Sequence, residues 1–199
     1  MKYLVLDLEL TGPDVGYHDI IQIGAVLCDA HWNEQSHFLS NVYPENPEAF
    51  SRRSEEVHGL SIYDLEDAPE RYEVLEAFER WVRQTLGRNE YASLKDVLLC
   101  GQGILTDVNF LKWAFEEENI EWPFSYKVLD LMSFSFLMYK ILKNNGKKVP
   151  KSHSLDAVAG MFALSRDTEE HNALEDARIT AACFKAYWEI ADQLKLHED

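Results

Sequence analysis

Residues Lys2–Leu10, with the sequence KYLVLDLEL, have the composition of a buried β-strand that ends in two acidic side chains. Side chains on a strand point alternately to its two faces, so Asp7 and Glu9 lie on the same face as Tyr3 and Val5. The apolar start of that face places the two carboxylates where the strand leaves the core. Polar residues often end strands, and the pair by itself fits a solvated strand end as well as a cation site.

The segments that follow this strand predict an α/β fold with a mixed sheet. Strands expected at 20–29 and 35–42 would complete a β-meander, after which strands and helices alternate. Short strands are expected at 97–100 and 126–130, and helices at 72–86, 107–118, from 130 through Leu142, at 155–162 and at 173–194. Nothing in residues 1–199 resembles a repeat or a linker, so we expect one domain.

The composition restricts the class of protein and of partner. With 19 Lys+Arg against 35 Asp+Glu, the net charge is −16, which opposes a salt-dependent grip on long duplex DNA. Cys28, Cys100 and Cys183 are far apart in apolar stretches, as is typical of reduced core cysteines in a cytoplasmic protein. Acidic residues interrupt the apolar N-terminus early, so we expect neither secretion nor contact with a membrane.

Two further acidic positions are ambiguous when each is taken alone. Asp107 falls near the start of a predicted helix, where an aspartate commonly interacts with the helix dipole. Asn172 is a predicted N-cap with Glu175 three residues later, close to a capping box. Asp176 would then project from the first turns, and His171 would remain on the preceding loop. An ordinary capped helix with a surface histidine explains this second pattern as well.

Four carboxylates and one histidine together suit a more specific chemistry. Oxygen ligands are preferred by hard divalent cations, and an imidazole titrates near neutral pH, as a general base requires. The set to be tested consists of Asp7, Glu9, Asp107, Asp176 and His171.

The order of the motifs resembles the DEDDh family of 3′-5′ exonucleases, over nearly the whole chain. The segments that carry the resemblance are Asp7-Leu8-Glu9 with Thr11-Gly12, Ile21-Gln22-Ile23-Gly24-Ala25-Val26, His58-Gly59-Leu60, Asp107 before Asn109-Phe110-Leu111, Ser154 to Ala159, and His171-Asn172-Ala173-Leu174-Glu175-Asp176-Ala177. The resemblance implies a ribonuclease H-like fold, in which helices flank a mixed central sheet. It also implies hydrolysis of terminal phosphodiesters, which releases nucleoside 5′-monophosphates.

The same resemblance implies roles for individual residues. Two Mg²⁺ or Mn²⁺ ions would be held by Asp7, Glu9, Asp107 and Asp176. His171 would deprotonate the attacking water, and Leu8, Leu10 and Thr11 would contact the terminal nucleotide. The chain departs from the family pattern at Gln102-Gly103, where His-Asn is usual, at Thr106, where an aromatic is common, and at Leu10, where threonine is frequent. We expect these departures to affect substrate preference more than the hydrolytic reaction itself.

The expected substrates are 3′ ends of single-stranded DNA or RNA, or short oligonucleotides. A lysine-rich segment with Lys140, Lys143, Lys147, Lys148 and Lys151 could hold phosphates of a single strand, or could be a solvated loop. The sequence leaves open the choice between DNA and RNA, homodimer formation and association with a polymerase or another repair protein.

Two other functions fit parts of the pattern. An aspartyl-phosphate phosphatase would need a second aspartate two residues after the nucleophile, where this chain has Glu9. A catalytically silent exonuclease-fold module that binds nucleic acid or protein would keep the fold without needing all the acidic positions.

Overall fold

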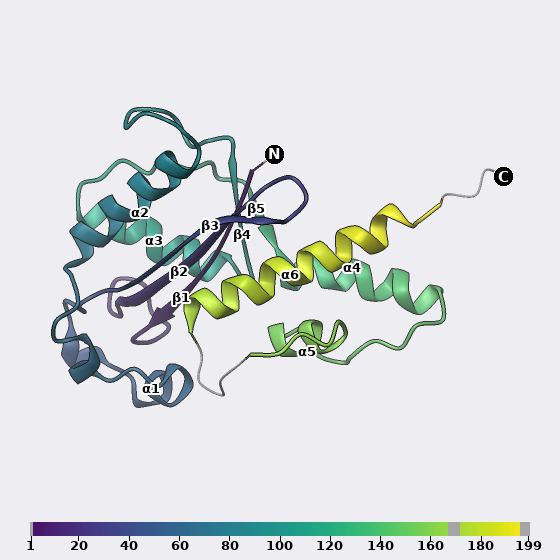
Figure 1. Ribbon diagram of the computed structural model, residues 1–199. Helices are drawn as coiled ribbons and strands as arrows, with labels where there is room; N and C mark the ends of the chain where they lie inside the picture. The colour runs from purple at the N-terminus through teal and green to yellow at the C-terminus, as the bar shows by residue number, and fades with distance from the viewer. Residues whose placement is uncertain (1, 167–171, 196–199) are drawn as a thin grey trace.

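The computed structural model describes residues 2–166 and 172–195. Its sheet has the strand order β3-β2-β1-β4-β5 (Figure 1). The strands are β1 (Lys2–Leu10), β2 (Ile20–Cys28), β3 (Glu34–Asn41), β4 (Val97–Gly101) and β5 (Val128–Asp130). β1 pairs antiparallel with β2, and β2 with β3, whereas β4 is parallel to both β1 and β5. The mixed sheet is therefore confirmed, and each observed strand begins or ends within two residues of its expected range.

The helices agree with the sequence pattern except at one place. They are α1 (Arg52–His58), α2 (Arg71–Thr85), α3 (Leu105–Glu117), α4 (Leu131–Asn144), α5 (Leu155–Gly160) and α6 (Ala173–Asp192), with 3₁₀ turns at Pro47–Ala49 and Ile62–Leu65. Helix α1 was not expected, because its sequence RRSEEVH offers a single apolar side chain and so no amphipathic period. Helix α6 begins at Ala173, directly after the Asn172 cap, as predicted.

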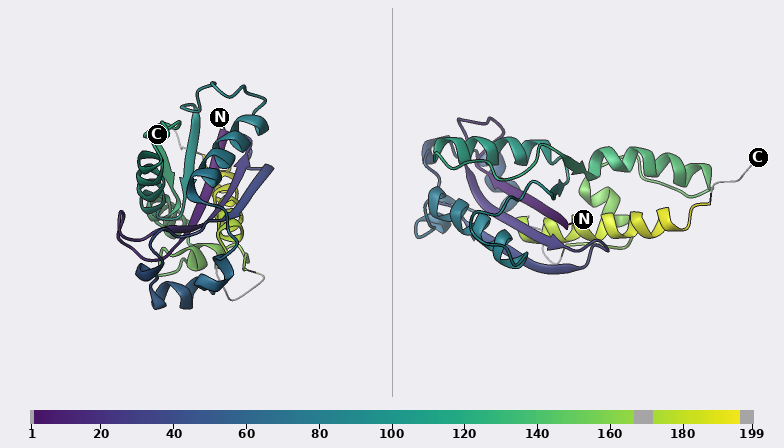
Figure 2. Two further views of the ribbon diagram at one scale, coloured as in Figure 1. Left: turned by 90° about the vertical axis from the view of Figure 1, so that its left-hand side faces the viewer. Right: turned by 90° about the horizontal axis from the view of Figure 1, so that it is seen from above.

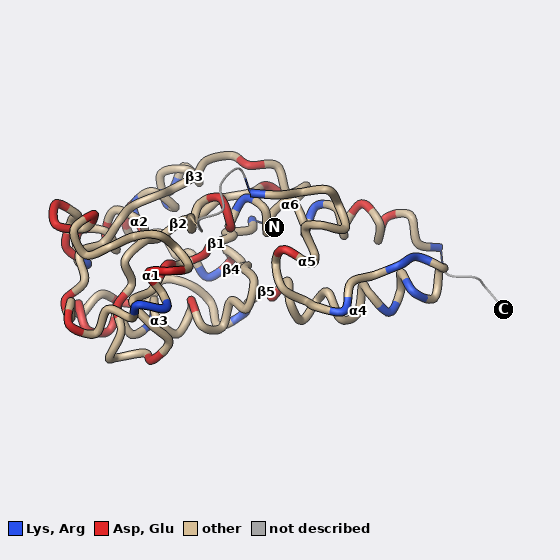
Figure 3. Tube along the Cα trace, turned by 90° about the horizontal axis from the view of Figure 1, so that it is seen from below, with Lys and Arg blue, Asp and Glu red and all other residues tan. Residues whose placement is uncertain are grey.

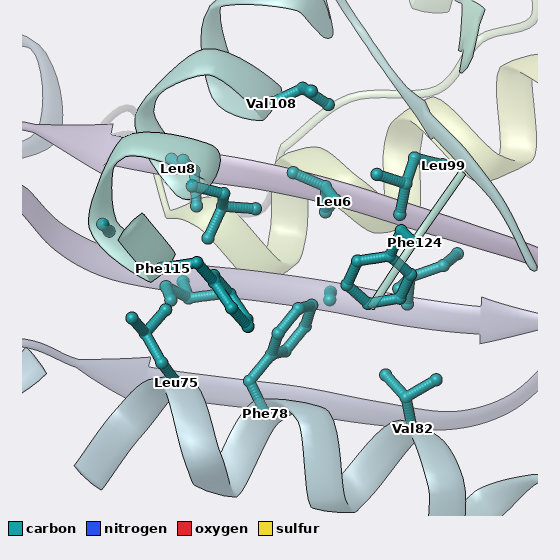
Figure 4. Close-up of a cluster of buried hydrophobic side chains, with 14 of the residues drawn as sticks. Leu6, Leu8, Leu75, Phe78, Val82, Leu99, Val108, Phe115 and Phe124 are labelled. Carbon is teal, nitrogen blue, oxygen red and sulfur yellow. The ribbon is translucent and has the colours of Figure 1, made fainter. Parts of the chain in front are cut away.

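The two faces of β1 pack against different sets of helices. Leu6 and Leu8 point to the face covered by α2 and α3, where Phe78 and Phe115 fill the layer (Figure 4). Tyr3 and Val5 point to the other face, against α4, α5 and α6. Burying side chains of this size contributes about 1.5–3 kcal/mol each. The alternation that Lys2–Leu10 predicts is confirmed, and both layers depend on it.

The parallel strands place their carboxyl ends at one edge of the sheet. Glu9 lies near the end of β1, Gly101 ends β4 and Asp130 ends β5, and α3 begins at Leu105, after the short loop that follows β4. In open sheets of this kind, ligands bind outside the carboxyl ends of the strands. Figure 2 shows α4 and α6 continuing beyond the sheet, so these two helices extend away from that edge.

Close contact between β2 and the start of α6 depends on two residues of β2, Gly24 and Gln22. A Cβ atom on Gly24 would lie 2.1 Å from the main chain of Ala173 and Leu174, so no larger residue fits there. The side-chain oxygen of Gln22 accepts a hydrogen bond from the Ala173 amide at 3.0 Å. Because Gly24 is the register partner of Asp7, this docking brings the first turn of α6 beside the acidic end of β1.

The expectation about the cysteines can be compared with the structure. Cys28, Cys100 and Cys183 are all buried free thiols, as expected. Trp32 is also buried, and it stacks on Tyr3 at a centroid distance of 3.9 Å. Within the described ranges, none of the helices combines the length and the hydropathy that crossing a bilayer requires.

Candidate active site

Three elements bring four carboxylates to the carboxyl edge of the sheet. Asp7 and Glu9 project from β1 on the face that α6 covers, as their spacing predicts. Asp107 lies in the first turn of α3 and is 7% exposed. Asp176 lies in the first turn of α6 and is 4% exposed. The structure therefore brings together all four acidic residues that the sequence analysis predicted for the site.

The cap of α6 fixes the position of Asp176. The side chain of Asn172 accepts hydrogen bonds from the amides of Leu174 and Glu175, at 3.1 and 3.3 Å, which confirms the predicted N-cap. The amide of Ala173 donates a hydrogen bond to the side chain of Gln22, so the helix start is also tied to β2. Asp176 is thus presented by a fixed helix terminus rather than by a loop.

Burial and the like charges nearby raise the pKa values of three of these carboxylates, those of Asp7, Glu9 and Asp107. Burial, and then the charges of Asp107, Glu9 and Asp176, raise the pKa of Asp7 well above its ordinary value. Burial and the charge of Asp176 raise the pKa of Glu9 to about 8. Burial also raises the pKa of Asp107, although the Leu8 amide bonds its carboxylate and opposes the rise. The cluster needs a cation to be fully ionised at neutral pH.

Arg166 supplies positive charge to this cluster. Its guanidinium donates two hydrogen bonds to Asp176, at 2.5 and 2.9 Å, and a third to Asp156 of α5. Its charge also lowers the pKa values of Asp7 and Glu9, against the stronger effect of burial. Sequence reasoning missed Arg166; its place five residues before His171, in an acidic stretch, was the only available signal.

The donor set fits divalent cations, but the arrangement must change to hold them. Oxygen Oε1 of Glu9 is buried and has no hydrogen-bond partner among the described residues, which is costly unless a cation or a donor reaches it. Within the described ranges, no three His, Cys, Asp or Glu side chains form a group that could hold a metal ion as they stand. Both oxygens of Asp176 bond Arg166, so cation binding there requires Arg166 to release them.

An open groove of about 470 Å³ lies beside Glu9, and we call it the β1–α1 groove. It is lined by Leu8, Glu9, Leu10, Arg53, His58 and Thr106, among others. Two of the predicted contacts to substrate, Leu8 and Leu10, are therefore in position to meet a ligand. Arg53 contributes a cation from α1, the helix that the sequence did not indicate, and forms no ion pair with any described carboxylate.

Thr11 has a different place from its neighbours. Its side chain is fully buried and its hydroxyl accepts a hydrogen bond from the Asp19 amide at 2.8 Å. Its carbonyl oxygen accepts the Ser51 amide, also at 2.8 Å. Thr11 thus anchors Ser51, which precedes α1 and lines the groove. Direct contact between Thr11 and a ligand stays a prediction.

His171 falls outside the described residues, so its role stays a prediction. Hydrogen bonds hold the loop before Asp107 in place. Gln102, at the position where the sequence departs from the family pattern, donates from its side chain to the His153 carbonyl at 2.8 Å. The amide of Gly103 donates to Asp130 at 2.7 Å, and Asp130 also caps α4. These bonds tie the loop before Asp107 to α4 and to the segment that follows it.

Comparisons with known proteins agree with this geometry. A family model described as "Exonuclease", that of RNase_T, matches residues 4–184. A PolC-type DNA polymerase III of Thermotoga petrophila is 29% identical over 194 residues, which are 96% of this chain and 12% of that protein. The 3′-5′ DNA exonuclease Cap18 of Escherichia coli is 24% identical over 195 residues, with 98% and 95% covered.

The fold is also that of a solved nuclease. The nuclease domain of 3′hExo, a DEDDh family member bound to rAMP, superposes with a TM-score of 0.75 at 19% identity. The alignment covers 100% of this chain and 96% of that one. This likeness confirms the expected ribonuclease H-like arrangement, in which helices flank a mixed sheet.

Proposed function

The chain belongs to the RNase_T exonuclease family, and from that premise we propose that it removes nucleotides one at a time from the 3′ end of single-stranded nucleic acid. Residues 1–199 would act as one exonuclease domain. The observation that carries the proposal is the convergence of Asp7, Glu9, Asp107 and Asp176 beside an open groove. The products would be nucleoside 5′-monophosphates.

Two divalent cations, Mg²⁺ or Mn²⁺, would be held by these four carboxylates. Such ions would supply activation of the attacking water and stabilisation of the leaving 3′ oxygen. The protein contributes a fixed donor set: Asp7 and Glu9 on a central strand, and Asp107 and Asp176 on helix starts. The elevated pKa values of Asp7 and Glu9 support this proposal, because added positive charge would favour their ionised forms.

The β1–α1 groove would receive the terminal nucleotide. Leu8 and Leu10 offer apolar contact for a base or sugar, and Arg53 offers a charge-assisted contact for phosphate. The anchoring of Thr11 to Asp19 and Ser51 holds the wall of this groove in place. The preference for DNA or RNA would depend on the residues that line this groove. Two of them, Leu10 and Thr106, depart from the family pattern.

His171 would accept the proton from the attacking water. An ordinary imidazole titrates near pH 6.5, which suits a general base at neutral pH, and one such base contributes about 10²- to 10⁴-fold to rate. We expect His171→Ala to lower kcat by that factor, to leave metal affinity unchanged and to flatten the acidic limb of the pH–rate profile. Restoration of the rate by excess Mn²⁺ would instead identify His171 as a metal ligand.

A ladder assay tests the proposed function. Single strands of DNA and of RNA, labelled at the 5′ end, should shorten by one nucleotide at a time in Mg²⁺ or Mn²⁺. Asp7→Asn should abolish shortening because it removes a charge from the cluster, while circular dichroism shows the fold unchanged. Shortening from the 5′ end, or activity near wild type in Asp7→Asn, would contradict the assignment.

One observation favours a second candidate, a catalytically silent module. Arg166 already pairs with Asp176, as it would in a protein whose cluster never binds cations. Isothermal titration with Mg²⁺ and Mn²⁺ separates the two: an exonuclease binds both ions at millimolar concentration or below, and a silent module binds neither. The polymerase relative makes association with a replication or repair protein part of this proposal, whichever candidate holds.

A further inference from the structure

One segment that the proposed active site does not use carries five of the 19 lysines and arginines of this acidic protein. Residues 131–155 contain five lysines and no aspartate or glutamate, in a chain with 35 acidic residues. Figure 3 shows the positive charge along α4 and the segment after it, whereas acidic residues gather at the opposite end of the molecule. None of the five lysines forms an ion pair with a carboxylate in the described part of the chain. They are available to an external anion.

Three of these lysines line an open groove of about 500 Å³, which we call the lysine groove. Lys140 and Lys143 reach it from α4, and Lys151 reaches it from the segment after that helix. Phe136 and His153 line the same groove. Their rings stack with centroids 3.7 Å apart and planes inclined by 12°, yet Phe136 remains 60% exposed.

The lysine groove is joined to the carboxylate cluster by one exposed stripe of α4. Met132, Phe136, Lys140 and Lys143 recur at intervals of three or four residues, so they share one helix face. At its start, Met132 lies against Gly103: a Cβ atom on that glycine would be 3.7 Å from the Met132 methyl. Gly103 belongs to the loop that leads into Asp107.

Hydrogen bonds fix the groove relative to the active site. His153 is held by Gln102 through its carbonyl oxygen, at 2.8 Å, and by Ser135, which lies 2.6 Å from its Nδ1. Gln102 is one residue from Gly103 in the loop before Asp107. The aromatic stack and the carboxylate cluster are therefore attached to the same short loop.

We infer that the lysine groove binds the phosphates of a single strand upstream of its 3′ end, with a base stacked on Phe136; this inference rests on the proposed function. From Met132 to Lys143, α4 rises about 17 Å at 1.5 Å per residue. A strand with phosphates 3.4 Å or more apart covers that length in roughly three to five nucleotides. Lysines interleaved with an aromatic ring are the combination that sequence-independent single-strand binding uses.

Kinetics on substrates of two lengths test the inference. The groove variant carries Lys140→Gln, Lys143→Gln and Lys151→Gln. The control variant carries Lys2→Gln, Lys95→Gln and Lys127→Gln, which remove the same charge from exposed positions at or near the amino ends of β1, β4 and β5. An eight-nucleotide strand reaches the lysine groove from the cluster, and a dinucleotide does not.

For the groove variant we expect KM for the eight-nucleotide strand to rise about tenfold with kcat unchanged, and dinucleotide hydrolysis to stay within twofold of wild type. The slope of log(kcat/KM) against log[salt] should become shallower by about 2, since each phosphate contact to a single strand contributes about 0.7. The control variant should behave as wild type. Equal effects on both substrates, no effect, or the same effect in the control would overturn the inference.

A binding measurement keeps the inference separate from the proposed function. In an Asp7→Asn background, fluorescence anisotropy reports binding of a labelled eight-nucleotide strand without turnover. If the unmodified protein hydrolyses neither substrate, the proposed function fails, while weaker binding by the groove variant still supports the groove. If the groove variant binds the strand as tightly as the protein with all its lysines, the inference about the lysine groove is overturned. If the groove variant binds a poly-glutamate peptide more weakly but binds the strand as before, the lysine groove is instead a site for an acidic protein segment.

Phe136 provides an independent check. Phe136→Ala should weaken binding of the eight-nucleotide strand about 5- to 100-fold, the usual effect of losing one stacked base. Phe136→Tyr keeps a ring that can stack on His153 and on a base, so it should restore binding. If Phe136→Tyr fails like Phe136→Ala, or if neither changes affinity, base stacking at this position is excluded.

Discussion

Arg166 is the residue that distinguishes this carboxylate cluster from a simple set of ligands. It bonds both oxygens of Asp176 and reaches Asp156, so it neutralises the cluster from the α5 side. A cation that uses Asp176 must compete with this guanidinium. Arg166 thus sets a cost on metal binding and at the same time stabilises the metal-free protein.

We expect Arg166→Gln to lower the unfolding free energy in EDTA by about 3 kcal/mol, because breaking a largely buried ion pair leaves carboxylates uncompensated. The apparent Kd for Mn²⁺ should fall, and added Mn²⁺ should raise the melting temperature more than in wild type. Thermal denaturation and calorimetric titration give both values.

Arg178→Gln is the matched control, since Arg178 makes a comparable two-bond pair with Glu34 on the exposed side of α6. It should change the melting temperature little and Mn²⁺ affinity not at all. Weaker Mn²⁺ binding by Arg166→Gln would show that Arg166 supports the metal site instead of competing with it.

Glu9 makes the stability of the metal-free protein depend on pH. Its pKa is near 4.5 when exposed and about 8 in the folded chain, so between these values the folded state holds a proton that the unfolded state has lost. The unfolding free energy should therefore fall as pH rises from about 4.5 to about 8. Glu9→Gln cannot titrate, and its melting temperature in EDTA should fall less steeply over that range.

The comparison is made by calorimetry at several pH values from 5 to 8.5. Saturating Mn²⁺ should also flatten the wild-type profile, because a cation stabilises the ionised carboxylates. If Glu9→Gln and wild type keep parallel profiles in EDTA, the elevated pKa of Glu9 is wrong.

At the scale of elements, the contact between β2 and α6 decides whether the cluster forms. Gly24 has no room for a side chain, because its Cβ would lie 2.1 Å from main-chain atoms of Ala173 and Leu174. Backbone atoms at a capped helix start cannot move aside as a flexible side chain can. Displacing α6 would carry Asp176 away from Asp7.

We expect Gly24→Ala to destabilise the protein by about 3 kcal/mol, at the upper end of the cost of overpacking, and to lower kcat more than KM. Gly160→Ala is the control, since nothing lies within 4 Å of a Cβ atom there. Denaturant unfolding and steady-state kinetics measure both. Equal stability of the two variants would show that α6 tolerates displacement.

At the scale of the whole molecule, charge is distributed unevenly. The net charge of −16 repels long nucleic acid, and the cations of residues 131–155 lie along one end of the molecule (Figure 3). A duplex presents many phosphates to the acidic surface, whereas a single strand can follow a narrow path. The protein should therefore discriminate by strandedness more than by sequence.

We expect a 15-nucleotide single strand to be shortened at least tenfold faster than the matching blunt duplex, with distributive loss of nucleotides from the 3′ end. A time course with 5′-labelled strands at two enzyme concentrations measures rate and processivity together. A preference for the duplex, or full-length strands converted directly to mononucleotides, would contradict this expectation.

The sequence by itself determined the local features. The period of two in Lys2–Leu10 placed Asp7 and Glu9 on one face, and the Asn172 cap located the start of α6. Both follow from neighbours in the chain, because strand alternation and helix capping depend on residues a few positions apart. The helix at Arg52–His58 was not predicted, since its short polar sequence has no helical period of apolar residues.

Only the tertiary structure decided which distant groups meet. The bond between Gln22 and Ala173 joins residues 151 positions apart, and the bond between Gln102 and His153 joins residues 51 apart. Arg166 and Asp176 are ten residues apart, but their pairing depends on how α5 and α6 pack on the sheet. Such contacts depend on the packing of whole elements, whose free energy is shared among many side chains, so no local pattern specifies them.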